Sequence, residues 1–282
     1  MNRPALGPRP NPLPWKERII NFCFRAPLFF GATAFFGSLS LISSLWDKSG
    51  EVQHDIAQRW GRAITRISGA KVTVLNGQYL DGRVAVYAAN HLSYSDTPVI
   101  FGILPFQFRI VARHDLFKLP FIGWHLTRSG QVPVNVSNPR ASISSLSSAV
   151  KTLKSGMPVF IFPEGGRTET GHPESFLNGP AFMAIRAGVP IIPMALIGTH
   201  ELLPIHTSQF HPVPVTLAVG EPVDTTGYST RQAEELTERV RGTIRRLYYE
   251  HSYLQPPAQD AKAIDSMEQM EKSDETAENC NP

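Results

Sequence analysis

Short apolar runs alternate with longer segments of helical spacing from residue 71 to residue 219, and this alternation constrains the fold more than any other feature of the chain. The apolar runs are typical of buried strands, and they cover residues 71–75, 83–88, 108–112, 131–136, 157–162, 190–197 and 213–219. Helices are predicted at 96–104, 120–127, 139–153, 179–187 and 230–253. Strands that alternate with helices favour an α/β fold with a mostly parallel central sheet flanked by helices.

An apolar run near the N-terminus, Ala26–Trp46, has 21 residues and no formal charge. It is long enough to cross a hydrocarbon core of about 30 Å. A secretory signal is the alternative, because Ala32-Thr33-Ala34 imitates a cleavage site, but apolar sequence continues beyond it. Basic residues flank the run on both sides, and Pro27, two glycines and four serines interrupt it. We therefore favour a helix that dips into one leaflet over one that spans the bilayer.

The next segment, Glu51–Ser68, places apolar side chains at helical spacing and arginines on its other faces. This helix either packs on the core or pairs with the apolar run as a membrane-associated helix pair. The predicted organisation is a disordered leader (1–14), a membrane-associated helical segment (15–70), one α/β domain (71–254) and a disordered acidic tail (255–282).

Charge is distributed unevenly between the body and the tail. The tail from Gln255 has seven acidic residues and two lysines, a net charge of −5, so that residues 1–254 carry +8. A basic body suits a phospholipid surface, a phosphorylated substrate or a nucleic acid. Dispersed basic residues without a recognition motif disfavour nucleic acid. Cys23 and Cys280 provide neither a disulfide framework nor a zinc site, which fits a reducing compartment.

A histidine and a carboxylate follow the predicted strand 83–88. His91 and Asp96 are five positions apart at the edge of a sheet, where open α/β folds gather their binding groups. A neutral imidazole is suited to removing a hydroxyl proton, and a carboxylate can fix its tautomer. Ser93 or Ser95 is expected to cap the next helix. A structural role for the pair is the alternative, and a metal site is disfavoured because no further ligand cluster lies nearby in sequence.

A second polar segment, Phe162–Thr168, follows the predicted strand 157–162. Gly165 and Gly166 let the backbone approach an anion, and Arg167 beside them can hold a phosphate with two hydrogen bonds. With Glu164, these residues predict a phosphate site; a sharp surface turn with a solvated arginine is the alternative. The chain has no G-x-x-x-x-G-K-[ST] nucleotide loop.

Two further segments lie in order along the chain. In Arg113–Trp124, Arg113 and Lys118 are candidates to bind phosphates, while Phe121 and Trp124 line an acyl path or belong to the core. Val189–Met194 is predicted to be a core strand, with the wall of an acyl tunnel as the functional alternative.

Together these blocks resemble the glycerolipid acyltransferases typified by 1-acylglycerol-3-phosphate acyltransferase. Asn90-His91 to Asp96 resembles the N-H-x4-D block of that family, and Phe162–Arg167 resembles its F-P-E-G-T-R block. Val189–Met194 resembles V-P-I-x-P, while Arg113–Trp124 and the following 130–136 fall where the family has K-x-E-L, P-x-x-G and a strand ending in Asp-Arg. The common order and separations over residues 71–220 are more specific than any single block.

The resemblance implies an acyltransferase domain in which His91 is the base, Asp96 is its partner, and Glu164, Gly165 and Arg167 lie at the acceptor phosphate. The implied reaction moves an acyl group from acyl-CoA or acyl carrier protein to the 2-hydroxyl of a lysophosphatidic acid, giving phosphatidic acid in phospholipid biosynthesis without a cofactor. The implied location is the cytoplasmic membrane, with a monotopic or single-pass anchor and the catalytic domain on the cytoplasmic side. No oligomeric state follows from the resemblance.

The chain departs from the family pattern at several positions. Gly166 replaces threonine, Arg113 replaces lysine and Asp115 replaces glutamate; residues 134–136, Val-Asn-Val, stand where Ile-Asp-Arg is common. Arg140 is close enough in sequence to replace the missing arginine. The alternatives are another acceptor, such as glycerol-3-phosphate, a different lysophospholipid or an amino-acid lipid, and, in another class, a non-enzymatic membrane lipid-binding protein.

Overall fold

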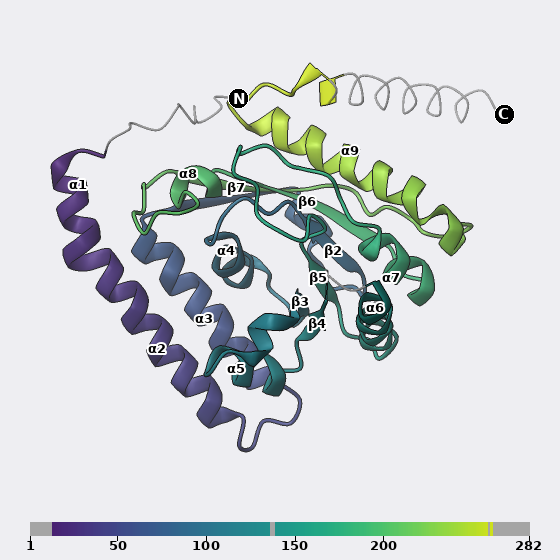
Figure 1. The fold of residues 1–282 in the computed structure, drawn as a ribbon, viewed down its shortest axis with the longest axis horizontal. Coiled ribbons are helices and arrows are strands. Elements are labelled where there is room, and N and C mark those ends of the chain that lie inside the picture. The colour runs from purple at the N-terminus through teal and green to yellow at the C-terminus, as the bar shows by residue number, and fades with distance from the viewer. Residues whose placement is uncertain (1–12, 136–138, 259, 262–282) are drawn as a thin grey trace.

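A seven-stranded sheet forms the centre of the computed structural model, with helices on both faces (Figure 1). The structure describes residues 13–135, 139–258, 260 and 261. The strands are β1 (Lys71–Leu75), β2 (Val86–Ala89), β3 (Arg109–Arg113), β4 (Val132–Val134), β5 (Val159–Ile161), β6 (Ile191–Ile197) and β7 (Pro214–Val219). Each corresponds to one of the predicted apolar runs, although most strands are shorter than their runs.

The strand order is β1-β7-β6-β2-β5-β3-β4, and neighbouring strands are parallel except β6 and β7. The prediction of a mostly parallel sheet is therefore confirmed. Parallel strands need both faces covered, which explains why the runs are apolar throughout rather than alternating. All seven residues of β6 are buried, so that the segment Val189–Met194 forms part of a core strand and its alternative reading as a tunnel wall is not supported.

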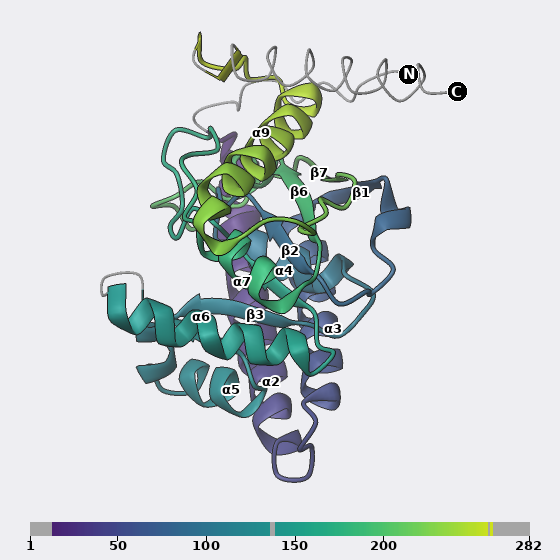
Figure 2. The same cartoon turned by 90° about the vertical axis from the view of Figure 1, so that its right-hand side faces the viewer.

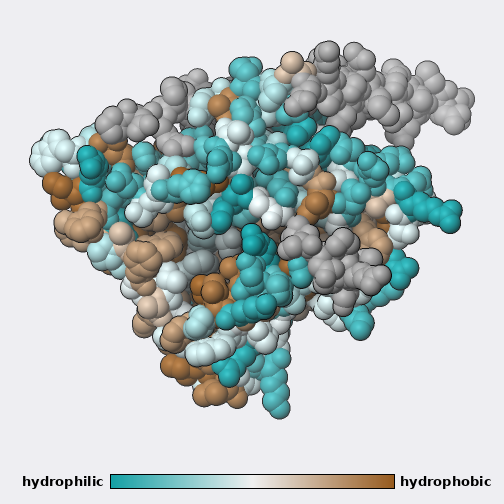
Figure 3. All heavy atoms as spheres, in the orientation of Figure 1, coloured by the Kyte–Doolittle hydropathy of each residue, from teal (hydrophilic) through white to brown (hydrophobic). Residues whose placement is uncertain are grey.

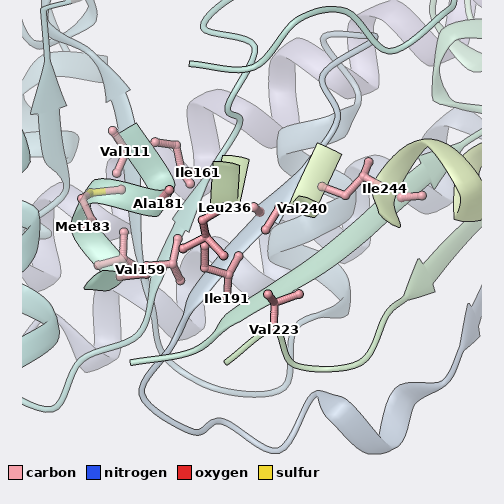
Figure 4. Packing of buried hydrophobic residues seen from close by; sticks show 14 of the residues in the cluster. Val111, Val159, Ile161, Ala181, Met183, Ile191, Val223, Leu236, Val240 and Ile244 are labelled. Carbon is pink, nitrogen blue, oxygen red and sulfur yellow. The ribbon is translucent and has the colours of Figure 1, made fainter. Parts of the chain in front are cut away.

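Helices cover the two faces in separate groups. Val86 and Ala88 of β2 belong to a cluster under α6 (Pro139–Lys154), α7 (Gly179–Ala187) and α9 (Ala233–His251), part of which is drawn in Figure 4. Tyr87 and Ala89 belong to a second cluster under α3 (Glu51–Ser68) and α4 (Asp96–Ile103). Successive residues of one strand thus serve opposite cores, as the period of two requires. The shorter helices are α5 (Ile122–Arg128), α8 (Thr199–Leu202) and the 3-10 segments 77–79, 114–118 and 230–232.

The sheet has a switch point between β2 and β5. From β2 the chain continues through α4 on one face, while from β5 it continues through α7 on the other. Because β2 and β5 are adjacent and parallel, their outgoing loops separate and leave a crevice at the carboxyl ends. Open α/β sheets bind their ligands at such a crevice.

The N-terminal part of the chain is one continuous helical run, made of α1 (Trp15–Ile20), a π-helical turn (Asn21–Arg25) and α2 (Ala26–Ser43). Pro27, the two glycines and the four serines that interrupt the apolar run do not break this helix. Pro27 has no N–H, and its ring would clash with the carbonyl of Cys23 in regular α-helix. The wider turn at 21–25 accommodates the proline without a break.

This helical run lies along α3 at the side of the domain (Figures 1 and 2). On its other face α3 packs closely on α4, where a Cβ at Gly61 would lie 2.4 Å from the Pro98 carbonyl oxygen. The segment Glu51–Ser68 thus packs on the core and also lies against the apolar run. Hydrogen bonds join the run to the domain at its beginning, middle and end: Asn21 to Phe210, Thr33 to Trp60 and Ser40 to His125.

Most of the predicted leader and tail, residues 1–12 and 262–282, lie outside the described residues. The described beginning of the tail differs from the prediction of disorder from residue 255. Asp260 is buried and forms an ion pair with Arg245 of α9 at 2.6 Å. This pair joins Asp260 to the last helix.

Candidate active site

A groove of about 780 Å³ lies at the carboxyl ends of β2, β5 and β3. The loop after β2 contributes His91 and Tyr94, and the loop after β5 contributes Gly165, Gly166 and Arg167. The inner wall is apolar and comes from β3, β4, β5 and α6: Ile110, Val111, Val134, Ile161 and Leu146. The groove therefore combines a polar mouth with an apolar interior, as small-molecule sites commonly do.

His91 and Asp96 meet at the mouth of this groove. The Nδ1 atom of His91 is 2.8 Å from Oδ2 of Asp96. The same Oδ2 accepts the backbone N–H groups of Leu92 and Ser93 at 2.7 and 2.8 Å. Asp96 is fully buried and begins α4, where the helix dipole stabilises a negative charge. An ionised carboxylate with these donors fixes the proton of His91 on Nδ1 and leaves Nε2 as the basic nitrogen.

The loop that carries His91 is held from two directions. Asn90 donates to the carbonyl of Leu196 in β6 and accepts from its N–H, at 2.9 and 2.7 Å. The imidazole stacks on Phe162, with ring centroids 4.0 Å apart and planes 11° from parallel. The residue before His91 thus anchors the end of β2 to the sheet, while the residue after β5 supports the ring.

Ser93 and Ser95 do not cap α4 through their side chains, contrary to expectation. The hydroxyl of Ser93 donates to the Leu203 carbonyl at 2.6 Å, and that of Ser95 contacts Ser93 and the Thr199 carbonyl. Both residues are buried in contact with the segment after β6. Neither hydroxyl lines the groove, so neither is placed to attack a substrate there.

Glu164 lies beneath the groove rather than inside it. Its Oε1 accepts the backbone N–H of His91 at 3.2 Å, and its Oε2 has no hydrogen-bond partner among the described residues. Burial raises the pKa of Glu164 to about 9, so that the carboxyl is protonated at neutral pH. The sequence placed this residue at a substrate phosphate, but a neutral carboxyl that is absent from the groove lining instead supports the His91 loop.

Glu164→Gln tests this protonation, because the amide keeps an acceptor for His91 and cannot ionise. The pKa of Glu164 is about 9 in the folded protein and about 4.5 in the unfolded chain. The bound proton therefore stabilises the folded state fully below a pH of about 4.5, and this stabilisation is lost as the pH rises through about 9. We expect equal unfolding midpoints near pH 4.5 and, at pH 8, a midpoint higher for the variant by roughly 2–4 °C for each kcal/mol gained.

The matched control is Glu250→Gln, which changes an exposed carboxyl on α9. Its midpoint should follow that of the unmodified protein at every pH. Thermal unfolding measured by circular dichroism decides the matter. If Glu164→Gln shows no advantage that grows with pH, Glu164 is not a buried neutral acid.

The loop after β5 brings Arg167 to the groove. Gly165 has φ +69°, a conformation that a side chain would strain. The guanidinium of Arg167 lies 3.5 Å from the ring centroid of Tyr94, in a cation–π contact between the two loops. A Cβ at Gly166 would meet no atom within 4 Å, so the threonine of the family pattern would also fit there.

The third predicted segment is only partly at the groove. Arg113 lines it, but its guanidinium is engaged by Asp115, with hydrogen bonds of 3.2 and 2.8 Å. Lys118, Phe121 and Trp124 are exposed and are absent from the groove lining. Neither aromatic therefore lines the groove, and neither is a buried core residue. Val136 and the side chain of Arg140 lie outside the described residues.

Sequence reasoning missed several groove residues. Tyr94 supports Arg167, while His206 and Glu169 lie at the rim, 3.1 Å apart. His206 belongs to the loop between α8 and β7, which has no recognisable motif, so nothing in the sequence indicated its position. In the described part of the chain, no group of three or more His, Cys, Asp or Glu side chains is arranged to hold a metal ion.

The chain is similar to known acyltransferases. Residues 71–197 match the model of a family described as Acyltransferase. The chain is 35% identical over 120 residues to the chloroplastic 1-acyl-sn-glycerol-3-phosphate acyltransferase of Arabidopsis thaliana, covering 43% of this chain and 33% of the relative. It is 30% identical over 246 residues to a 1-acyl-sn-glycerol-3-phosphate acyltransferase of Chlamydomonas reinhardtii, covering 84% and 71%. The match thus spans a third of the first relative and more than two thirds of the second.

A solved structure is also similar. The crystal structure of the 1-acyl-sn-glycerophosphate (LPA) acyltransferase of Thermotoga maritima superposes with a TM-score of 0.68 and 27% sequence identity, covering 82% of this chain and 95% of that one. The similarity therefore covers more of the chain than residues 71–197, which the family model matches.

Proposed function

The chain belongs to the family of 1-acyl-sn-glycerol-3-phosphate acyltransferases, and on that premise we propose that it acylates the 2-hydroxyl of 1-acylglycerol-3-phosphate to give phosphatidic acid. The observation that carries this proposal is the His91–Asp96 pair at 2.8 Å, at the mouth of a groove that Arg167 also lines. The pair supplies a base, and the arginine supplies a cation for the acceptor phosphate.

The proposed reaction is a direct transfer. The acceptor hydroxyl gives its proton to Nε2 of His91 as its oxygen attacks the thioester carbonyl. Asp96 stabilises the imidazolium that forms. The carbon–sulfur bond then breaks, and the thiolate takes the proton from Nε2 and leaves as a thiol. The new ester bond joins the acyl group to the acceptor, and His91 returns to its neutral form. These steps require no metal or other cofactor, and we propose that none is used.

The apolar interior of the groove suits the acyl chains of the two substrates. Ile110, Val111 and Ile161 line it beside His91, so that a chain could lie there while its reacting end stays near the imidazole. Acyl-CoA and acyl carrier protein both present a fatty acyl thioester, and we propose one of them as the donor.

We further propose that the protein is monotopic and sits on the cytoplasmic face of the membrane, where these donors occur. Residues Trp15–Ser43 form one helix that is long and apolar enough to cross a membrane. That helix is hydrogen-bonded to the domain at Asn21, Thr33 and Ser40, and it lies beside α3, which carries exposed arginines. A spanning orientation would draw these charges into the bilayer or detach the helix, whereas an interfacial one requires neither.

An acceptor panel tests the proposed function. Purified protein would receive labelled acyl-CoA or acyl-carrier protein with 1-acylglycerol-3-phosphate, glycerol-3-phosphate, lysophosphatidylethanolamine or an amino-acid lysolipid. We expect labelled phosphatidic acid as the main product. Preference for another acceptor would show that the protein is an acyltransferase with a different acceptor lipid. Absence of thiol release with every acceptor would favour a lipid-binding protein without catalysis.

A further inference from the structure

Most of the large apolar side chains that are exposed on the described chain fall into two groups. The first lies on α1 and α2, between Trp15 and Trp46. The second, which we call the α5 patch, lies on the 3-10 segment 114–118, the turn after it and α5, and it consists of Leu116, Leu119, Phe121, Ile122 and Trp124. Five exposed apolar side chains within nine residues are unusual for a surface that faces water.

The α5 patch is next to the C-terminal part of α2. Both ribbon views show α5 beside the lower end of α2 (Figures 1 and 2), and Oγ of Ser40 lies 2.7 Å from Nδ1 of His125. At this end of α2, Ile42, Leu45 and Trp46 are exposed. Figure 3 shows hydrophobic surface along the edge formed by α1 and α2 and again at the lower end of the molecule. The two groups thus form adjoining parts of one apolar region.

Backbone strain accompanies this exposure. Phe121 has φ 62° and ψ −56°, a conformation rarely adopted by residues other than glycine. Its side chain is 68% exposed, and its ring contacts Trp124 with centroids 5.1 Å apart. Residues with such strain are found mostly at active sites, ligand-binding sites and switch regions. Within the described protein, burial does not compensate for it, because both rings remain largely exposed.

We propose that the α5 patch inserts into the same leaflet as α1 and α2 and forms a second contact with the lipid bilayer. Phe and Trp side chains favour the membrane interface, where an apolar ring can be buried beside polar headgroups. Lys118 and Arg128 flank the patch and are exposed. Their charges suit anionic headgroups, which gives Lys118 a lipid phosphate as its partner in place of the substrate phosphate expected from the sequence.

This contact would place the groove at the bilayer surface. Leu116 belongs both to the α5 patch and to the lining of the groove, beside Arg113 and Asp115. A lipid could therefore pass from the leaflet to the groove along an apolar edge. If the N-terminal helix were the only membrane contact, the domain would be free to rotate about the axis of that helix. A second contact fixes the orientation of the domain on the membrane surface.

Fluorescent labels at single cysteines test the insertion. In a background without Cys23 and Cys280, an NBD label would be attached at Phe121→Cys, at Phe35→Cys on α2 or at Val74→Cys on β1, three exposed apolar positions. The full-length protein would be reconstituted with vesicles of phosphatidylethanolamine and phosphatidylglycerol. We expect nitroxide groups on the lipid acyl chains to quench positions 121 and 35, and aqueous iodide to quench position 74.

The outcomes separate this inference from the membrane proposal made above. Quenching by lipid at position 35 together with quenching by iodide at 121 would overturn the α5 contact and leave the N-terminal anchor in place. Exposure of both positions to iodide would overturn both proposals. A label at 121 that responds to acyl carrier protein but not to lipid would identify a protein partner and overturn the lipid assignment.

Phe121→Gly provides a second test that separates a membrane role from a structural one. Glycine relieves the positive φ but raises the entropy of the unfolded chain, so the two effects oppose each other and the variant is expected to remain folded. It should nevertheless bind vesicles about tenfold more weakly, because a large apolar side chain is lost. Val74→Gly removes an exposed side chain far from the patch and should leave vesicle binding unchanged. Unchanged vesicle binding by Phe121→Gly would contradict the proposal.

Discussion

His91→Ala is expected to lower kcat by about 10²- to 10⁴-fold, the usual contribution of a general base. The reason is geometric, because Asp96 fixes the Nδ1 proton and leaves Nε2 as the base at the groove. The loop itself should persist in the variant. Its position depends on the Asn90 side chain and on the backbone of residue 91, which alanine retains. Steady-state rates and thermal unfolding of the same preparation would test both statements.

His206→Ala is the matched control for this substitution. His206 also lines the groove, but it lies on an exposed loop and its partner is the exposed Glu169. Its removal should change kcat by no more than a few-fold. A wild-type rate in His91→Ala, or an equal loss in His206→Ala, would contradict the assignment of the base.

Arg167→Ala is expected to raise the KM for a phosphorylated acceptor by about 10- to 100-fold, because hydrogen bonds to a charged group contribute about 1.5–3 kcal/mol. For the same acceptor without its phosphate, the substitution should change KM little, since that acceptor makes no such bond. Measuring KM for 1-acylglycerol-3-phosphate and for 1-acylglycerol with one donor gives the comparison. A similar rise in KM for both acceptors would show that Arg167 does not bind the phosphate.

Tyr94 offers a companion test of the same site. Its ring lies under the guanidinium of Arg167, so Tyr94→Leu should raise the KM for the phosphorylated acceptor in the same direction but by a smaller factor. Tyr94→Phe keeps the ring and should behave as the unmodified protein. If Tyr94→Phe is as impaired as Tyr94→Leu, the hydroxyl and not the ring face is responsible.

The strands of the sheet were predictable because the apolar runs that form them can be recognised in the local sequence. Strands buried on both faces need continuous apolar runs, and the runs at 71–75 and 190–197 correspond to β1 and β6 almost residue for residue. The presence of His91 and Arg167 at the same edge of the sheet was also predictable, since both follow parallel strands and parallel strands end at one edge. Because β2 and β5 are adjacent in the sheet, the loops that follow them border one groove.

The side-chain environments were not predictable from local pattern. Glu164 and Arg167 are three positions apart in one loop, yet one lies beneath the loop and the other on the groove. Phe121 and Trp124 are large apolar residues of the kind usually found in a core, yet both side chains are exposed, and Phe121 has a positive φ. Each of these outcomes depends on tertiary packing.

Direct transfer to the acceptor hydroxyl at His91 is tested most directly by rapid quenching of a single turnover with a labelled acyl thioester. With 1-acylglycerol-3-phosphate present, the label should pass straight into phosphatidic acid. Without an acceptor, thiol release should be negligible and the protein should carry no label, because Ser93 and Ser95 are buried away from the groove. A labelled protein that forms without acceptor and then transfers its acyl group to the lipid at the catalytic rate would contradict the mechanism.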